Sequence, residues 1–160
     1  MSSDPFRPQK PSHITSVTEG LCALTATEAV ARLRAGEVTA AELVEASIAR
    51  IEEVDPKVNA LPIPCFDRAR DMARKLRPED HADNPKSLCG LPIAVKDYND
   101  VGGMRTTYGS PIFAQSVAGP SDATGRQLER NGAIPMAKSN VPEWAGGNTF
   151  NPVFGAIRNP

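Results

Sequence analysis

The sequence predicts an α/β fold, and three features indicate it. Two short apolar runs, residues 90–95 and 133–137, have the length of buried strands, and a lysine follows each of them. A stretch with helical spacing lies between the runs, so the order strand, helix, strand predicts two parallel strands joined by a crossover helix. Amphipathic segments with helix-start signals precede them.

Composition limits the possible functions. The 160 residues are enough for one domain with its own core. A net charge of -1 gives no general attraction to nucleic acid or to anionic lipid. The sequence has no apolar run long enough to cross a bilayer and no signal-peptide pattern. We therefore expect a cytoplasmic protein without a nucleic-acid or membrane partner.

The first helix should follow an irregular start. Residues 1–24 contain three prolines and no apolar periodicity, which predicts a mobile N-terminal arm. Thr25 and Glu28 then form a capping-box pattern, in which the side chain of each residue can accept the backbone N–H of the other. A helix should begin there and end at Gly36.

Thr39 and Glu42 repeat this pattern at once, and the second helix should close at residues 55–56, Asp-Pro. Prolines in residues 58–66 predict an extended segment instead of a central strand. A third helix should begin at Phe66, with a basic face that we expect to be solvated.

The first apolar run carries Lys96 and Asp97 to the carboxyl end of a strand that should be covered on both faces. Ligands of open α/β sheets bind beyond these strand ends, which makes Lys96 a candidate site residue. A phosphate-binding loop is excluded, because Val95 and Asp97 flank the lysine where such a loop needs glycine and Ser or Thr. The alternative is a structural lysine paired with Asp97 or Asp100.

The second apolar run leads to Lys138. A helix capped by Ser121 or Asp122 should precede it and end at residues 131–132, Asn-Gly. Because parallel strands bring their carboxyl ends to one edge, Lys96 and Lys138 should face one crevice. Two positive charges at that edge would need bound anions or carboxylates to stabilise them, or would take part in catalysis.

Loops rich in glycine and asparagine should cover this edge. The backbone N–H groups of Gly146 and Gly147 are candidate donors to a bound substrate. The alternative is that the two glycines only allow the loop to turn.

Cysteine and histidine provide no further site. Cys22, Cys65 and Cys89 are widely spaced, which predicts reduced thiols. His13 and His81 lie in the predicted arm and a loop, so the sequence shows neither a Cys–His catalytic pair nor a zinc pattern. We expect no metal and no cofactor.

Five motifs follow one another in the second half of the chain. They are residues 90–97 (GLPIAVKD), 106–110 (TTYGS), 137–143 (AKSNVPE), 151–155 (NPVFG) and 159–160 (NP). In this order and spacing they resemble the N-terminal part of the amidase signature family. The resemblance covers about residues 25–160.

The resemblance implies an α/β/α fold with a mixed central sheet, of which residues 25–160 form the N-terminal part. It also implies hydrolysis of a small-molecule carboxamide by a Ser/cis-Ser/Lys triad, with Lys96 as the lysine. A lysine of this kind accepts a proton from a bridging serine, which activates the nucleophilic serine. It must be neutral near pH 7, well below the ordinary lysine pKa of about 10.4.

The family carries its bridging serine between glycines, and these 160 residues contain no such Ser-Ser pair. We therefore expect a chain truncated at its C-terminal side and inert alone. Three functions remain open: an amidase, an inactive fragment that acts as an interaction module, and the amide-hydrolysing subunit of a transamidation complex. A homo-oligomer is also possible.

Overall fold

A three-stranded mixed sheet forms the centre of the protein. In it β3 (Ile134–Ser139) lies in the middle, β2 (Pro92–Lys96) pairs with it in parallel and β1 (Ile63–Pro64) pairs with it antiparallel. The parallel pair confirms the predicted strand, helix, strand unit, and the two-residue β1 agrees with the extended, proline-rich segment. The computed structural model describes residues 17–77, 79 and 83–159.

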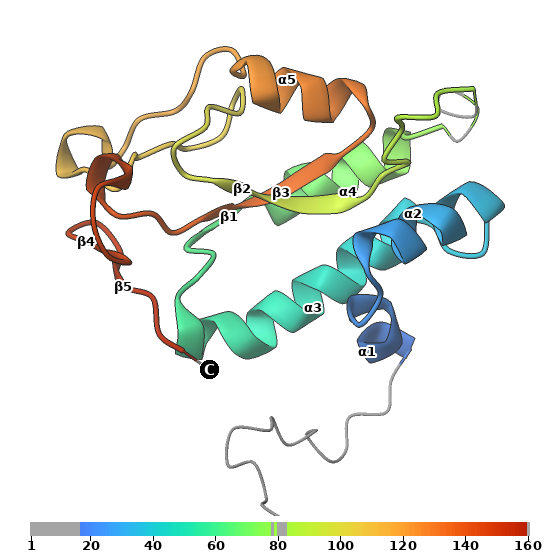
Figure 1. Ribbon diagram of the computed structural model, residues 1–160, viewed down its shortest axis with the longest axis horizontal. Helices are drawn as coiled ribbons and strands as arrows, with labels where there is room; N and C mark the ends of the chain where they lie inside the picture. The colour runs from blue at the N-terminus through green and yellow to red at the C-terminus, as the bar shows by residue number, and fades with distance from the viewer. Residues whose placement is uncertain (1–16, 78, 80–82, 160) are drawn as a thin grey trace, which may run out of the picture.

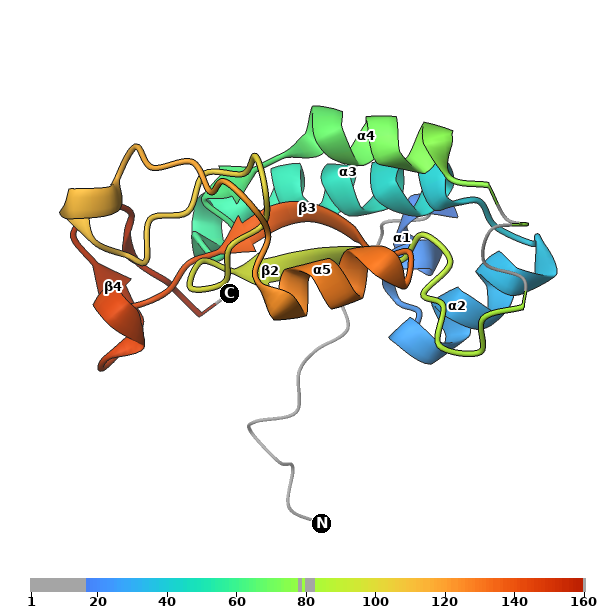
Figure 2. The same cartoon turned by 90° about the horizontal axis from the view of Figure 1, so that it is seen from above.

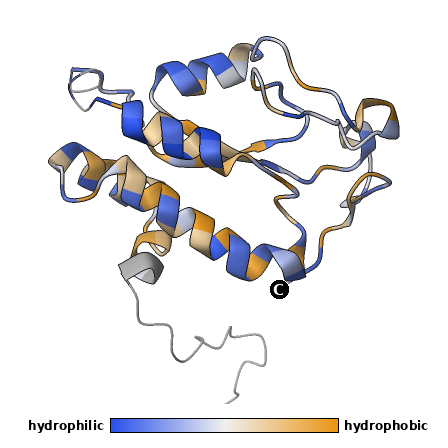
Figure 3. Ribbon diagram, turned by 180° about the vertical axis from the view of Figure 1, so that it is seen from behind, coloured by the Kyte–Doolittle hydropathy of each residue, from blue (hydrophilic) through white to orange (hydrophobic). Residues whose placement is uncertain are grey.

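Helices lie on both faces of this sheet (Figures 1 and 2). The helix α5 (Ala123–Arg130) crosses one face, and α3 (Ala40–Val58) and α4 (Phe66–Lys75) lie on the other. Polar and apolar residues alternate around these helices, as expected for helices with one buried side (Figure 3). The main core joins α3, α4 and β3. Its buried members are Ala40, Val44, Ile48, Ala69, Ala73, Ile134 and Met136.

Both predicted capping boxes are present, at the starts of α2 (Ala26–Ala35) and α3. The Thr25 N–H donates to Glu28 Oε2 at 2.8 Å, and the Glu28 N–H donates to Thr25 Oγ1 at 3.3 Å. Thr39 and Glu42 form the same reciprocal pair. These local signals could be read from sequence because each box closes within one helical turn.

The predicted arm over residues 1–24 needs correction at its end. Its first part, residues 1–16, lies outside the described residues, whereas α1 (Val17–Cys22) is helical. Leu21 and Leu24 pack against the buried cluster beneath α2. These leucines give the segment an apolar side to bury, although it lacks a full apolar period.

The predicted end of α3 is also wrong, because the helix continues through Pro56 to Val58. Proline is tolerated there since the helix ends within the same turn. Asn59 closes the helix in the left-handed region with φ of 59°. The Asp55 carboxylate then accepts the backbone N–H groups of Ala60 and Leu61.

The burial of β2 differs from prediction. Ala94 and Lys96 are exposed, whereas Val95 between them is buried. In the described chain β2 is an edge strand, because it pairs only with β3. The apolar run therefore covers one face of the strand, and the other face at its carboxyl end is open.

A short hairpin of β4 (Phe150–Asn151) and β5 (Gly155–Ala156) is the last element of the described chain, where the sequence predicts only loop. Asn151 is buried and organises it. Its Nδ2 donates to the Val141 carbonyl at 2.8 Å, and its Oδ1 accepts two backbone N–H groups of the hairpin turn. Strands of two residues leave no periodic pattern in a sequence.

Candidate active site

Lys96 lies at the carboxyl end of β2, as predicted. The chain turns directly after it, because the Asn99 N–H donates to the Lys96 carbonyl at 2.9 Å. The side chain is exposed, and Nζ lies 5.8 Å from the centroid of the Tyr98 ring. Among the described residues Lys96 forms no ion pair within 4.0 Å, so neither Asp97 nor Asp100 is its partner.

Lys138 is fully buried, with 0% of its surface exposed. Its Nζ donates to the Asn99 carbonyl at 2.7 Å and to Thr106 Oγ1 at 2.8 Å, and it lies 3.4 Å from Asp97 Oδ1. Burial lowers the pKa of Lys138, and the nearby Asp97 carboxylate opposes that shift. The residue therefore binds one end of the loop that follows β2.

The two lysines do not face one crevice, which corrects the sequence prediction. In the parallel pairing Lys138 lies beside Val95, whereas Lys96 lies beside Ser139. Paired residues point to the same face of a sheet and successive residues point to opposite faces. Lys96 and Lys138 therefore project from opposite faces. The carboxyl ends of β2 and β3 do meet at one edge. The face from which each lysine projects depends on the register between the strands, which shifts between Ile93 and Ala94.

Asp97 is also fully buried, on the same side as Lys138. Both of its carboxylate oxygens accept the Thr107 N–H at 3.1 Å, and the Thr107 hydroxyl donates to Oδ2. Its carbonyl accepts the Tyr108 N–H at 3.1 Å. The carboxylate thus has both an ionic partner and hydrogen-bond donors, which a buried charge requires.

Two further acids near this strand end are hydrogen-bonded. The Tyr108 hydroxyl donates to Asp100 Oδ1 at 2.7 Å, and this bond, together with burial and the nearby carboxylates, raises the pKa of Tyr108 to about 12. Burial would raise the pKa of Asp122, but hydrogen bonds from the Gly125 N–H and the Asn99 amide hold it below its usual value. Asp122 is also the cap of α5, as one of the two predicted choices.

Aromatic rings extend from Lys96 to the loop after β3. Tyr108 stacks on Trp144 with centroids 5.2 Å apart, and Phe113 meets both rings edge-on. Tyr98, below the Lys96 amine, meets Tyr108 edge-on at 6.0 Å. Tyr108 and Trp144 have φ of 53° and 52°, a backbone conformation that residues other than glycine rarely adopt. The rings contact one another across the two loops, although Tyr98 and Trp144 stay 44% and 50% exposed.

Gly146 and Gly147 lie in an exposed loop after η3 (Glu143–Ala145). The Gly146 N–H donates to the Glu143 carbonyl at 3.0 Å, which closes a turn. Gly147 has φ of 92°. Their part in substrate binding stays a prediction.

Sequence reasoning missed the polar network behind Lys96. Thr106 and Thr107 are buried, and Ser110 Oγ is buried without a hydrogen-bond partner among the described residues. Two adjacent threonines in a loop give no spacing signal, so their burial could not be predicted. The sequence predicts that Lys138 follows a strand, but it does not indicate that the side chain is buried.

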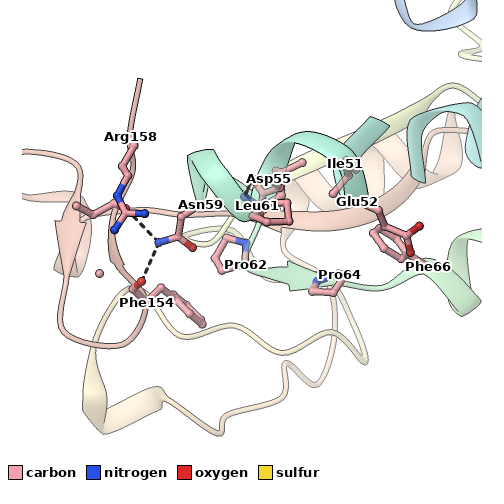
Figure 4. Close-up of a pocket in the computed structure, with 13 residues that line it drawn as sticks. Ile51, Glu52, Asp55, Asn59, Leu61, Pro62, Pro64, Phe66, Phe154 and Arg158 are labelled. Carbon is pink, nitrogen blue, oxygen red and sulfur yellow. Dashed lines mark hydrogen bonds between the residues drawn. The ribbon is translucent and has the colours of Figure 1, made fainter. Parts of the chain in front are cut away.

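Two cavities formed by described residues lie away from Lys96. One, of 510 Å³, is bounded by the end of α3 and by β5, and Asp55, Asn59 and Arg158 line it (Figure 4). The other, of 620 Å³, lies between α2 and α4 and reaches Cys89. Neither is lined by Lys96, so we assign no catalytic role to them.

Within residues 17–77, 79 and 83–159 no group of His, Cys, Asp and Glu is arranged to hold a metal ion. The three cysteines are free thiols, and burial raises the pKa of Cys65. In the same part of the chain no helix combines the length and the apolar character needed to cross a membrane.

Comparisons with known proteins agree on one family. The family model described as Amidase matches residues 42–160. A glutamyl-tRNA(Gln) amidotransferase subunit from Koribacter versatilis (strain Ellin345) is 39% identical over 127 residues, which is 78% of this chain and 26% of that protein. The structure of the peptide amidase of Stenotrophomonas maltophilia superposes with a TM-score of 0.74 at 26% identity, over 86% of this chain and 30% of that one.

A fatty acid amide hydrolase structure has a TM-score of 0.81 at 20% identity, over 92% of this chain and 26% of that one, and this likeness supports the fold alone. The chain spans between a quarter and a third of the length of these proteins.

Proposed function

The chain belongs to the amidase family, and from this premise we propose that it contributes the catalytic lysine, Lys96, to hydrolysis of a carboxamide C–N bond. The observation that supports this role best is the environment of Lys96: an exposed amine at a strand end, without an ion-pair partner among the described residues. A base must be reachable and must lose its proton readily, and a bound carboxylate would oppose both requirements.

In the proposed reaction the neutral Lys96 amine accepts the proton of a bridging serine, which takes the proton of a nucleophilic serine. The nucleophile forms an ester bond to the amide carbon, and the C–N bond breaks as the leaving nitrogen receives the proton. Water then hydrolyses the ester. The serine pair that the family places between glycines does not occur in these 160 residues.

The proposed substrate is a small-molecule amide, with the candidate donors Gly146 and Gly147 near it and no cofactor. The test is ammonia release from a panel of carboxamides by the protein expressed from the full gene, together with labelling by a serine-directed fluorophosphonate. Turnover of at least one amide with labelling of one serine is the expected result. Absence of both would contradict an amidase and favour an inactive interaction module.

A second candidate is the amide-hydrolysing subunit of a transamidation complex. It is favoured by the 39% identity to the glutamyl-tRNA(Gln) amidotransferase subunit from Koribacter versatilis. The two candidates differ in their partners, because a component of such a complex would act with other proteins and an amidase would act alone or as a homo-oligomer. Purification of the tagged protein from its own cells separates them. A stoichiometric partner and glutamine-dependent ammonia release would support the transamidation complex.

A further inference from the structure

A buried ion pair lies behind Lys96. Lys138 Nζ and Asp97 Oδ1 are 3.4 Å apart, and both side chains are 0% exposed. Burying two charges is costly unless each is paired and hydrogen-bonded. Lys138 meets this requirement with the Asn99 carbonyl and the Thr106 hydroxyl as its other acceptors. All three partners belong to the segment directly after Lys96.

These contacts fix the direction of Lys96. Asp97 is held by Lys138 and Thr107, and Val95 on the other side of Lys96 is buried in the apolar cluster with Met104. Successive side chains of a strand alternate between faces. Both neighbours of Lys96 are held on the buried side, which we call the inner face. Lys96 must therefore project from the opposite, exposed side, which we call the open face.

The carboxylates at this strand end all have partners of their own. Asp97 binds Lys138, Asp100 accepts from Tyr108, and Asp122 accepts from an amide side chain and a backbone N–H. None of these three carboxylates forms an ion pair with Lys96 within 4.0 Å.

We propose that Lys138 is a positioning residue for Lys96: it binds the Asp97 carboxylate on the buried inner face, just beyond the end of β2, so that Lys96 stays on the exposed open face without a counter-ion among the described residues. The inference rests on the proposed function, in which Lys96 is the base. A carboxylate freed from Lys138 would be one residue away from Lys96. It would favour the protonated form of the amine, which can neither accept a proton nor react as a nucleophile.

The test is the chemical reactivity of Lys96 in the folded protein. Lys138→Met removes the charge while keeping most of the side-chain volume. The protein is treated with acetic anhydride at about pH 8, and acetylation of Lys96 is measured by peptide mass spectrometry relative to Lys57, an exposed lysine on α3. The Lys96 to Lys57 ratio should fall by at least about threefold in Lys138→Met. It should return to within about twofold of the parent in the double variant Asp97→Asn/Lys138→Met, in which position 97 carries no carboxylate.

A milder pair of variants covers the case in which Lys138→Met does not fold. Thr106→Val removes one acceptor of Lys138 at nearly constant shape, and Thr106→Ser restores it. The ratio should fall in the first and recover in the second, whereas Thr124→Val, an exposed control on α5, should leave it unchanged. An unchanged ratio in the folded Thr106→Val and Lys138→Met variants, or an equal fall in the double variant, would overturn the proposal.

The labelling ratio needs no substrate, so it is independent of whether Lys96 takes part in amide hydrolysis. A fall in the ratio together with full activity of Lys96→Ala would keep the positioning role and reject the proposed function. An unchanged ratio together with lost activity of Lys96→Ala would keep the proposed function and reject the positioning role of Lys138.

Discussion

Lys96 and Lys138 leave the same end of the sheet on opposite faces, one exposed and the other 0% exposed. The two residues therefore have different chemistry, although each follows an apolar run in the sequence. A buried lysine with three polar neighbours supports structure, whereas an exposed lysine without a counter-ion is available to a reactant. This difference supports the proposal that Lys96 is the base.

The capping box of α3 gives a first prediction. Thr39→Ala removes the hydroxyl that accepts the Glu42 N–H, and it should lower the free energy of unfolding by about 1 kcal/mol. Thr27→Ala, an exposed position inside α2, is the matched control and should be neutral or slightly stabilising, because alanine favours helix. Urea unfolding followed by circular dichroism measures both. Equal effects would mean that the box contributes nothing.

The same box predicts a pH dependence. Hydrogen bonds from the Thr39 backbone N–H and hydroxyl lower the pKa of Glu42 below its ordinary value of 4.5. A lowered carboxyl pKa stabilises the fold above the unfolded-state pKa, and this contribution is lost as the pH falls through the folded-state pKa. The difference between Thr39→Ala and the parent should therefore shrink between about pH 5 and pH 3. A constant difference would contradict the reciprocal bond.

Two glycines with similar φ distinguish the cost of backbone strain from the cost of crowding around a new Cβ. Gly36, the predicted end of α2, has φ of 70° and open space where a Cβ would lie. Gly109 has φ of 67°, but its Cβ would lie 2.6 Å from the Val141 carbonyl oxygen. Gly36→Ala should cost about 1 kcal/mol of unfolding free energy, and Gly109→Ala should cost at least about 1 kcal/mol more. Thermal or urea unfolding compares them, and equal costs would show that the loop moves freely.

Tyr108 should titrate unusually late. The hydrogen bond to Asp100 is the largest of the causes that raise the pKa of Tyr108 to about 12. The raised pKa stabilises the folded protein fully below about pH 10, the ordinary tyrosine pKa, and this stabilisation is lost as the pH rises toward 12. The chain has two tyrosines, so Tyr98→Phe leaves Tyr108 as the one that tyrosinate absorbance follows. Adding Asp100→Asn should move the midpoint toward about 10. A midpoint near 10 without that change would mean that the bond is absent.

The part of the fold that sequence predicts is the part with local signals. Two capping boxes, the strand ending on Lys96 and the helix capped at Asp122 each depend on residues within one turn or one strand. The face on which Lys138 lies could not be predicted, because it depends on the register between strands that are far apart in sequence. The network of Asp97 with Thr107 has the same cause, since loop closure brings these residues together.

The resemblance to a known family makes Lys96 the candidate base, and the family model confirms the family itself. It gave no indication that Lys138 would be buried. Local patterns and motifs therefore predicted the candidate base, and only the three-dimensional contacts indicated what holds it in place.

The central claim is that Lys96 is the base of an amide hydrolase, and the most direct measurement is kcat/KM of Lys96→Ala in the protein expressed from the full gene. We predict a fall of about 100-fold or more, because general bases contribute about 10²–10⁴ to the rate, with folding unchanged by circular dichroism. Lys86→Ala, which removes another exposed lysine, is the control and should keep the parent activity. A Lys96→Ala variant that stays folded and retains activity within about tenfold of the parent would contradict the claim.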